Sequence, residues 1–182
     1  SFRRLPTEIE GVVLIEPDVH GDERGFFVET FRESELAELG IDVHFVQDNH
    51  SRSAARVLRG IHSQRGQAKL VRCPKGRIFD VAVDLRPDSP TYKRWQGYEL
   101  DDVTHRQLFI PDGFGHGFCV LSDSADVLYR VSSYYDPELE SGIAWDDPDV
   151  GIDWPVDDPL LSERDRGAPW LSEVADDLPF TY

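Results

Sequence analysis

The sequence lacks several features that would place it in a specialised class of protein. It has no apolar run of 18 or more residues, so we expect no transmembrane helix. Residues 1–6 lack the apolar stretch of a signal peptide, which predicts a soluble protein that is not exported by that route and works in the cytoplasm. Repeats and low-complexity linkers are also absent. Since 182 residues suffice for one substantial core, we expect a single domain over residues 1–182.

Cysteine and basic residues are scarce as well. Only two cysteines occur, Cys73 and Cys119, each inside an apolar run, a pattern typical of buried free thiols and not of a disulfide framework or a metal knuckle. The 19 Lys and Arg residues face 35 Asp and Glu residues, giving a formal net charge of −16. Because phosphate-backbone binding needs dense Lys and Arg, this charge argues against nucleic-acid or anionic-membrane binding. It also makes Arg24, Arg59 and Lys69, each beside glycine or a predicted strand, candidates for an anion site.

Short apolar or alternating runs, separated by turn residues, fill most of the chain. They predict strands at residues 11–16, 25–31, 43–48, 56–62, 69–73, 77–85, 95–100, 106–111, 116–121 and 127–131. Strands at this spacing predict an all-β sandwich or barrel with covered edges. One helix is expected at residues 34–39, with Ser34 as N-cap and Gly40 as the stop. The tail beyond Trp145, with one helical turn at residues 160–165, is expected to pack over the barrel and complete a pocket.

Two histidines stand at strand ends beside glycines, where a ligand can approach the backbone. The Pro-x-Gly-x-x-His pattern that ends at His116 resembles the second motif of the cupin superfamily, in which the histidine is a metal ligand, and favours a cupin-type jelly-roll barrel. The first cupin motif is His-x-His followed shortly by Glu, whereas His62 is followed by Ser63 and Gln64. The sequence therefore predicts a cupin barrel whose pocket works without a metal.

A histidine is a competent base near neutral pH when a carboxylate or carbonyl holds its other ring nitrogen. Asp80, Asp84 and Asp165 are candidates for that partner. Asp80 lies in the middle of an apolar strand, where a carboxylate is costly unless it is paired. For Asp84 the simpler interpretation is that it starts the polar turn at residues 86–87.

Seven motifs, taken in order, resemble one enzyme family. They are GDERGFF (21–27), FVQDNHS (45–51), LRGIH (58–62), AKLVR (68–72), FDVAVD (79–84), GHGF (115–118) and YYDP (134–137). Together they resemble the dTDP-4-dehydrorhamnose 3,5-epimerases over about residues 10–169. The resemblance implies a cofactor-free enzyme that inverts C3 and C5 of dTDP-4-dehydro-6-deoxy-D-glucose. The C4 ketone acidifies the hydrogens on both neighbouring carbons, so a base can remove one and a proton can return to the opposite face.

The resemblance also implies catalytic roles for four residues. His62 is the base, Asp165 orients it, and Tyr129 donates a proton from the other face. Lys69 stabilises negative charge that develops on the C4 oxygen. By position alone, the preferred interpretation of Tyr129 is a strand tyrosine packed against the barrel, and Lys69 is equally a solvated strand end.

Further residues are implied in substrate binding. They are Arg24, Phe27, Glu29, Gln47, Asn49, Arg59, His116, Tyr135, Glu140 and Arg164. The arginines suit a diphosphate, Phe27 and Tyr135 suit stacking on thymine, and His116 is expected to pair with Asp80.

Strand parity bears on the geometry and on assembly. Arg59 and His62 are three residues apart, so on a regular strand they point to opposite faces. Both reach one pocket only if Gly60 bends or bulges the strand, or if a neighbouring subunit shares the site. Dimers with exchanged N-terminal strands are typical of the family, which implies a homodimer in which Arg24 and Glu29 serve the partner's pocket.

The chain departs from the family pattern directly after His62, where an aromatic residue and a longer loop are usual. Here Ser63 opens a short loop over residues 63–68. Related enzymes invert only C3 or only C5, so a monoepimerase is the alternative to a double epimerase. A metal-dependent cupin oxygenase and a non-catalytic sugar-nucleotide binding module are further alternatives, distinguished by bound metal and by the absence of proton exchange.

Overall fold

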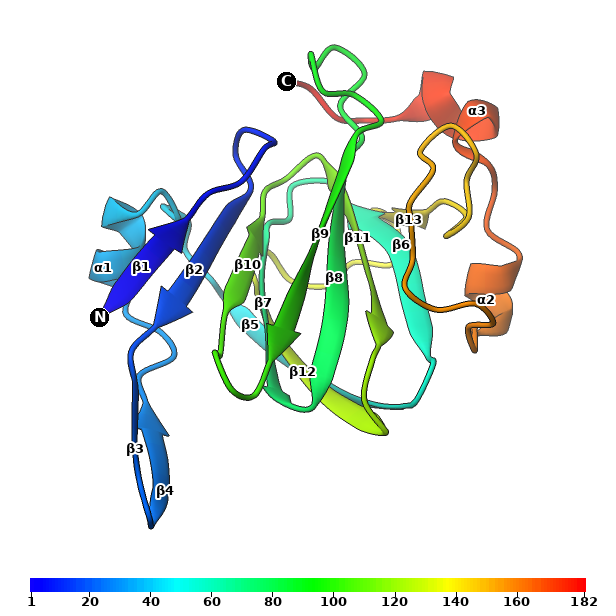
Figure 1. The fold of residues 1–182 in the computed structure, drawn as a ribbon. Helices are drawn as coiled ribbons and strands as arrows, with labels where there is room; N and C mark the ends of the chain where they lie inside the picture. The colour runs from blue at the N-terminus through cyan, green and yellow to red at the C-terminus, as the bar shows by residue number, and fades with distance from the viewer.

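The computed structural model describes residues 1–182 as two antiparallel β-sheets packed face to face (Figure 1). The six-stranded sheet has the order β1 (Phe2–Leu5), β2 (Val13–Pro17), β10 (Gln107–Ile110), β7 (Lys69–Lys75), β12 (Ser124–Val131) and β5 (Gln47–Ala54). The five-stranded sheet has the order β13 (Glu140–Gly142), β6 (Leu58–Gln64), β11 (Phe114–Val120), β8 (Arg77–Asp84) and β9 (Trp95–Asp101). The predicted all-β jelly roll is thus present, built as two sheets that do not close into one continuous barrel.

The core between the sheets follows from the two-residue period of strands. In β8, Ile78 and Ala82 point inward, and they meet Val71 and Leu108 of the opposite sheet in one fully buried cluster. Asp80 lies between Ile78 and Ala82 and shares their inward direction, so a carboxylate enters the space between the sheets.

The outer faces of both sheets are covered by other parts of the chain. Helix α1 (Glu33–Glu38) packs Leu36 on Leu70 and Phe109 of the six-stranded sheet. The C-terminal tail, with α2 (Glu163–Arg166), α3 (Leu171–Val174) and the 3-10 helix η1 (Ala175–Asp177), packs Leu171 and Phe180 over the five-stranded sheet (Figure 1). The prediction that the tail folds back over the barrel is confirmed. None of these helices is long and apolar enough to cross a membrane.

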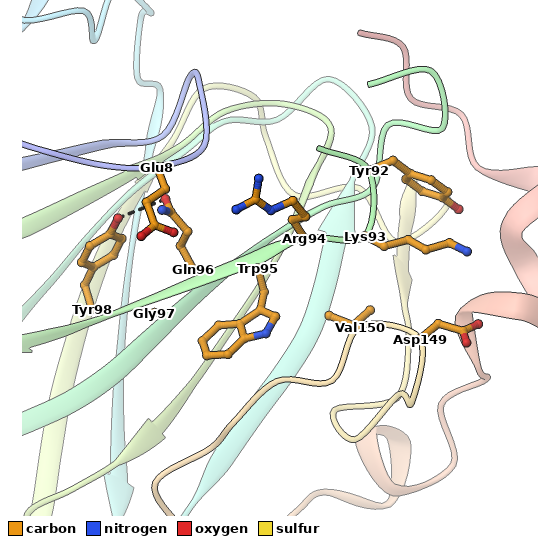
Figure 2. A pocket seen from close by; sticks show the side chains of 10 residues that line it. All are labelled: Glu8, Tyr92, Lys93, Arg94, Trp95, Gln96, Gly97, Tyr98, Asp149 and Val150. Carbon is orange, nitrogen blue, oxygen red and sulfur yellow. Dashed lines mark hydrogen bonds between the residues drawn. The ribbon is translucent and has the colours of Figure 1, made fainter. Parts of the chain in front are cut away.

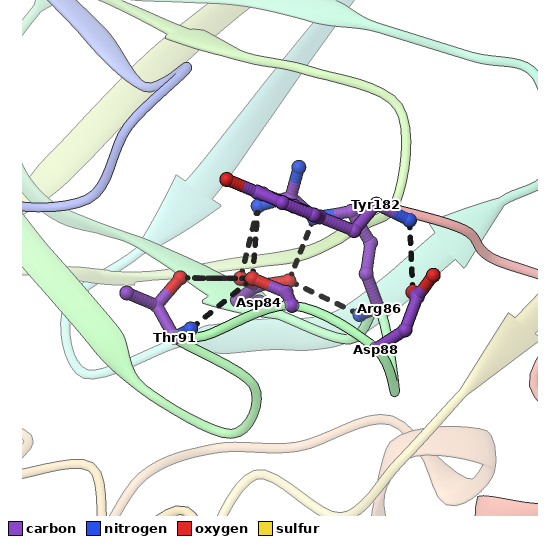
Figure 3. A network of polar contacts seen from close by, with 6 residues as sticks. Asp84, Arg86, Asp88, Thr91 and Tyr182 are labelled. Atoms are coloured by element: carbon purple, nitrogen blue, oxygen red, sulfur yellow. Dashed lines mark hydrogen bonds and ion pairs between the residues drawn. The ribbon is translucent and has the colours of Figure 1, made fainter.

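The end of the tail is held at the turn after β8 (Figure 3). Asp84 is fully buried and accepts hydrogen bonds of 2.6–3.0 Å from Arg86, Ser89 and Thr91. Burial raises the pKa of Asp84, yet these donors hold it below its ordinary value. The Arg86 guanidinium lies 5.0 Å from the ring centre of Tyr182. Asp84 therefore organises this turn, as its position in the sequence predicts.

A two-stranded hairpin of β3 (Val19–Asp22) and β4 (Gly25–Val28) projects from the body of the molecule (Figure 1). Its side chains Phe26 and Phe27 are 59% and 72% exposed, an unusual placement for large apolar groups. The hairpin therefore presents an apolar surface that this chain does not itself cover.

Several predicted boundaries are wrong. The strand predicted at 43–48 is β5, which begins only at Gln47 and runs to Ala54; its polar sequence hides it because it is an edge strand with polar groups on both faces. Helix α1 starts at Glu33 after the extended residue Arg32, so Ser34 is inside the helix and not its N-cap. The helical turn in the tail begins later than predicted, with Ser162 as the cap of α2. Strands β1, β3 and β13 were not predicted.

Strand β6 contains the bulge that its sequence predicts at Gly60. His62 pairs with His116 and Arg59 pairs with Phe118, so four residues of β6 (59–62) lie opposite three residues of β11 (116–118). Gly60 has φ +140°, and a Cβ there would lie 2.6 Å from the Cα of Gly117. Only glycine fits this close contact between backbones. The bulge therefore shifts the alternation of side-chain directions along β6 before His62 is reached.

Gly60→Ala is expected to lower the free energy of unfolding by about 3 kcal/mol, because the new methyl group meets the Gly117 backbone and the positive φ disfavours alanine. Urea unfolding measures the loss. Gly66→Ala is the control, since Gly66 also has positive φ but open space around it, and is expected to cost about 1 kcal/mol. Equal losses in the two variants would contradict the close backbone contact.

Candidate active site

A cavity of about 240 Å³ opens between the two sheets, and both sheets contribute to its walls. Its lining residues are Asn49, His62, Ser63, Gln64, Gln67, Lys69, Tyr129, Tyr135, Glu140 and Arg164. The structure thus gathers seven residues that the sequence singled out, together with Ser63, Gln64 and Gln67, which it did not. Gln64 had a signal in the sequence, since it stands two residues after His62 and so shares its strand face.

His62 of the cavity wall forms a close polar contact with Asp165 behind it. Nε2 of His62 lies 2.6 Å from Oδ1 of Asp165, while Oδ2 accepts a 3.1 Å bond from the Gly60 N–H. Ser162 caps α2 by accepting from the Asp165 N–H, which fixes the position of the carboxylate. Burial raises the pKa of Asp165, but the hydrogen bonds from His62 and Gly60 hold it below its ordinary value.

The consequence of this contact is a defined imidazole tautomer. A carboxylate only accepts hydrogen bonds, so Nε2 of the neutral His62 ring carries the proton. The lone pair then lies on Nδ1, the other ring nitrogen. The His62 side chain is 30% exposed and Asp165 only 5%, so the ring faces the cavity and its partner is shielded from water.

His116 and Asp80 form a second pair beside the first, on the next two strands of the sheet. His116 faces His62 across the β11–β6 register, and its Nε2 lies 2.6 Å from Asp80 Oδ1. Both side chains are buried, and His116 does not line the cavity. Burial lowers the pKa of His116 although Asp80 opposes the shift. The second oxygen of Asp80 has no hydrogen-bond partner.

The opposite wall supplies Lys69 from β7 and Tyr129 from β12. Burial lowers the pKa of Lys69 to about 8, against the attraction of Glu140 and Asp80. The Lys69 Nζ atom lies 5.7 Å from the ring centre of Tyr129. Burial also raises the pKa of Tyr129, although Asn49 opposes this by hydrogen bonding. The wall therefore offers a cation at neutral pH and a protonated phenol.

Basic side chains also line an adjoining hollow of about 410 Å³ between β6 and the tail. This hollow shares His62 and Arg164 with the cavity and adds Arg59, whose Nε donates to Ser53 at 2.9 Å. Arg164 pairs with Glu140 at the boundary between the two spaces. The bulge at Gly60 brings Arg59 and His62 to one continuous space, so the parity conflict in the sequence is resolved within one chain.

The hairpin residues are not part of this cavity. Arg24 pairs with Asp22 and its side chain is 86% exposed, while Glu29 pairs with Arg32. Phe27 lines a shallow hollow on the hairpin itself. Within one chain, Arg24, Phe27 and Glu29 therefore lie apart from His62 (Figure 1).

A larger hollow lies elsewhere, along the edge strand β9 (Figure 2). Its volume is about 630 Å³, and Glu8, Arg94 and Asp149 are among its charged side chains. It contains no histidine, and its Tyr98 hydroxyl bonds to Gln96 at 3.0 Å. Size alone would select this groove, but the paired, buried titratable groups select the smaller cavity. No group of three or more His, Cys, Asp or Glu side chains is placed to hold a metal ion.

Comparisons with known proteins point to one family. Residues 6–173 match the family model of dTDP-4-dehydrorhamnose 3,5-epimerase. The protein of that name from Methanothermobacter thermautotrophicus is 55% identical over 95% of this chain and 96% of its own length. A dTDP-4-dehydrorhamnose 3-epimerase from Streptomyces niveus is 46% identical over 96% of this chain and 86% of its own length. The crystal structure of a 3,5-epimerase from Legionella pneumophila with dTDP-4-keto-L-rhamnose superposes with a TM-score of 0.96, at 45% identity, covering 100% of this chain and 99% of that one.

The buried amine of Lys69 is expected to cost stability at neutral pH. Lys69→Met should raise the free energy of unfolding at pH 7 by about 1–2 kcal/mol, because only the unfolded state hydrates the ammonium fully. Between pH 8 and 10.5 the unfolded chain keeps the Lys69 proton that the folded state has lost. The unaltered protein therefore gains stability with rising pH, and the advantage of the variant shrinks over that window.

Urea unfolding of both proteins from pH 7 to 10.5 checks this expectation. Lys75→Met, at the exposed end of the same strand, is the control and should show no such pH-dependent difference. A constant difference between Lys69→Met and the unaltered protein across the window would show that the Lys69 amine is not desolvated.

Proposed function

The chain belongs to the dTDP-4-dehydrorhamnose 3,5-epimerase family, and we propose that it inverts C3 and C5 of dTDP-4-dehydro-6-deoxy-D-glucose without a cofactor. One observation carries the proposal. His62 on one sheet, bonded to Asp165 of the tail, faces Lys69 and Tyr129 on the other sheet across a single cavity. Inversion at carbon needs a base and an acid on opposite sides of the sugar, and this arrangement supplies both.

The reaction begins with removal of a proton next to the C4 ketone. Nδ1 of His62 takes the proton, and Asp165 stabilises the imidazolium that forms. The electron pair of the broken C–H bond moves into an enolate, whose negative charge rests on the C4 oxygen. The Lys69 ammonium, held in a partly dry cavity, stabilises that oxygen more strongly than it would in water.

Inversion is completed from the other wall. The Tyr129 hydroxyl gives its proton to the carbon on the face away from His62, and the enolate electrons form the new C–H bond. Tyr129 is left as phenolate and His62 as imidazolium, so the pair resets by exchanging protons with solvent. The same steps at the second carbon complete the double epimerisation. No electron is transferred to or from the sugar, so the proposal requires no redox group.

The nucleotide is assigned to the space beside the cavity. Arg59 and Arg164 face the adjoining hollow and suit a diphosphate, which guanidinium groups bind through paired hydrogen bonds. Tyr135 is exposed at the mouth of the cavity and suits stacking on thymine. Gln47, Asn49 and Glu140 are proposed to contact the substrate around these groups. The His116–Asp80 pair is proposed to support His62 from the neighbouring strands β11 and β8.

We also propose that the protein is a homodimer with exchanged N-terminal strands. The exposed Phe26 and Phe27 on a projecting hairpin support this, because such a surface is stabilised by burial against a second chain. Exchange would bring Arg24, Phe27 and Glu29 to the partner's cavity, opposite Tyr135. A cytoplasmic location is proposed as well; the two free buried thiols, Cys73 and Cys119, fit a reducing compartment.

A single epimerisation is the second candidate. The Streptomyces niveus relative, 46% identical to this chain, is named a 3-epimerase, so likeness of sequence does not separate the two outcomes. The catalytic groups described above serve one carbon as well as two. The choice depends on how the sugar sits above His62, beside the short loop that follows Ser63.

Proton exchange tests the proposed chemistry directly. Incubation with dTDP-4-dehydro-6-deoxy-D-glucose in heavy water should place deuterium at C3 and C5, observed by proton NMR. His62→Asn should slow this exchange by about 1000-fold or more, because it removes the proposed base. Tyr129→Phe should still exchange protons through His62 but should form little inverted product, because the acid on the opposite face is missing.

Each outcome has a defined meaning. Exchange at one carbon alone identifies a monoepimerase. Tight dTDP binding without any exchange identifies a binding module and overturns the proposal. Full inversion by Tyr129→Phe would remove Tyr129 from its role while leaving His62 in place.

Mixing two inactive variants tests the exchanged dimer. A chain with His62→Asn is combined with a chain with Arg24→Ala, after separate unfolding and joint refolding. If Arg24 serves the partner's cavity, one site of each mixed dimer holds both defects and the other holds none, so activity reappears. If Arg24 acted in its own chain, the mixture would be no more active than the average of the two variants.

A further inference from the structure

The loop after β12, residues 132–137, carries two exposed aromatic side chains at the mouth of the cavity. Tyr134 is 71% exposed and Tyr135 is 54% exposed. We refer to this segment as the tyrosine loop. Exposed loops are usually mobile, because few buried contacts hold them. This loop is instead tied to the body of the molecule along its backbone.

Three glutamine side chains make these ties, and we refer to Gln47, Gln64 and Gln67 as the glutamine clamp. The amide of Gln67 donates to the Ser133 carbonyl at 2.9 Å, and the amide of Gln64 donates to the Tyr134 carbonyl at 3.0 Å. The Tyr135 N–H donates to the Gln47 side-chain oxygen at 3.1 Å.

A fourth bond completes the set, from the Asp136 N–H to the side-chain oxygen of Gln64 at 3.1 Å. Four consecutive residues of the loop are thereby each bonded to a glutamine. Gln64 alone forms hydrogen bonds to the loop on both sides of Tyr135, at Tyr134 and at Asp136.

The chemistry of the bonds explains why glutamine is used. Both ends of the Gln64 amide are satisfied, one as donor and one as acceptor, and a carboxylate lacks the donor. Gln64 and Gln67 are only 5% and 9% exposed, so their hydrogen bonds to the loop are largely shielded from water. A shielded donor or acceptor that lacks its hydrogen bond is costly to the folded state. A neutral amide also leaves the charges of His62 and Lys69 unperturbed.

The clamp connects the loop to the catalytic wall. Gln64 is two residues beyond His62 on β6 and shares its inward direction. Gln67 lies two residues before Lys69, and Gln47 also donates to Asn49 at 3.0 Å. The strands that carry the reacting groups thus set the position of the loop.

We propose that Gln47, Gln64 and Gln67 are positioning residues that hold the tyrosine loop as a preordered stacking platform for the nucleobase of a nucleotide sugar. The inference rests on the proposed function, because it assigns the thymine to Tyr135. A loop that is ordered before binding loses less conformational freedom when the ligand arrives. The ties therefore contribute to affinity through the loop, in addition to the contact with the substrate that is proposed for Gln47.

A double-mutant cycle with dTDP as the probe tests this mechanism. Gln67→Met removes one tie and is expected to raise the Kd for dTDP by about 3- to 10-fold, measured by calorimetry. In a Tyr135→Ala background the same change should alter Kd by less than about twofold, since the platform is already lost. Gln64→Met provides a second variant, and amide hydrogen exchange should be faster at Tyr135 and Asp136 in both.

Gln96→Met is the matched control. Gln96 is 6% exposed, accepts bonds from Ile9 and Tyr98, and lies in the groove along β9 (Figure 2). It should leave dTDP binding and exchange in the tyrosine loop unchanged. Additive losses in the cycle would show that Gln67 acts on dTDP binding independently of the Tyr135 platform and would overturn the proposal, as would equal losses for Gln96→Met. Failure of the unaltered protein to bind dTDP would overturn the proposed function and this inference together.

Discussion

The hydrogen bond between His62 and Asp165 joins parts of the chain that are 103 residues apart, and much of the fold serves to make it. Asp165 stands on a four-residue helix in the tail, which is held against β6 by backbone bonds of Leu160 and by the packing of Leu171 and Phe180 over the five-stranded sheet. The same carboxylate also accepts the Gly60 N–H, at the bulge that precedes His62. One short contact therefore fixes the tail, the bulge and the tautomer of the imidazole together.

The two sheets contribute different chemical groups to the site. The five-stranded sheet supplies the base and the His116–Asp80 pair beside it, the tail supplies Asp165, and the six-stranded sheet supplies the cation and the phenol. A strongly acidic chain thereby concentrates Arg59, Lys69 and Arg164 around one space, where an anionic ligand gains most from them. The buried amine and the unpaired oxygen of Asp80 are costly to the fold, and such costs are typical of functional sites.

Much of this arrangement could be predicted from the sequence, because the strands that build the core alternate clearly. The apolar runs around β6, β7, β8 and β11 predict the strands from which the sheets are built. The spacing of Arg59 and His62 indicates that the strand can bulge at Gly60. Strand β5 was misplaced because its alternation is polar on both faces, so hydrophobic periodicity has nothing to detect. The helix boundary at Arg32 was missed because no side chain caps it. The partnership of Asp165 with His62 was expected only through family resemblance, since no local pattern links residues so distant in the chain.

The orientation of the His62 ring is the point on which the account depends most. Nitrogen-15 NMR of the protein, labelled at histidine and recorded where the ring is neutral, reports which nitrogen carries the proton. The account predicts a protonated Nε2, held by Asp165, and an unprotonated Nδ1. A proton on Nδ1 would contradict it, because the ring would then have no lone pair directed at the sugar.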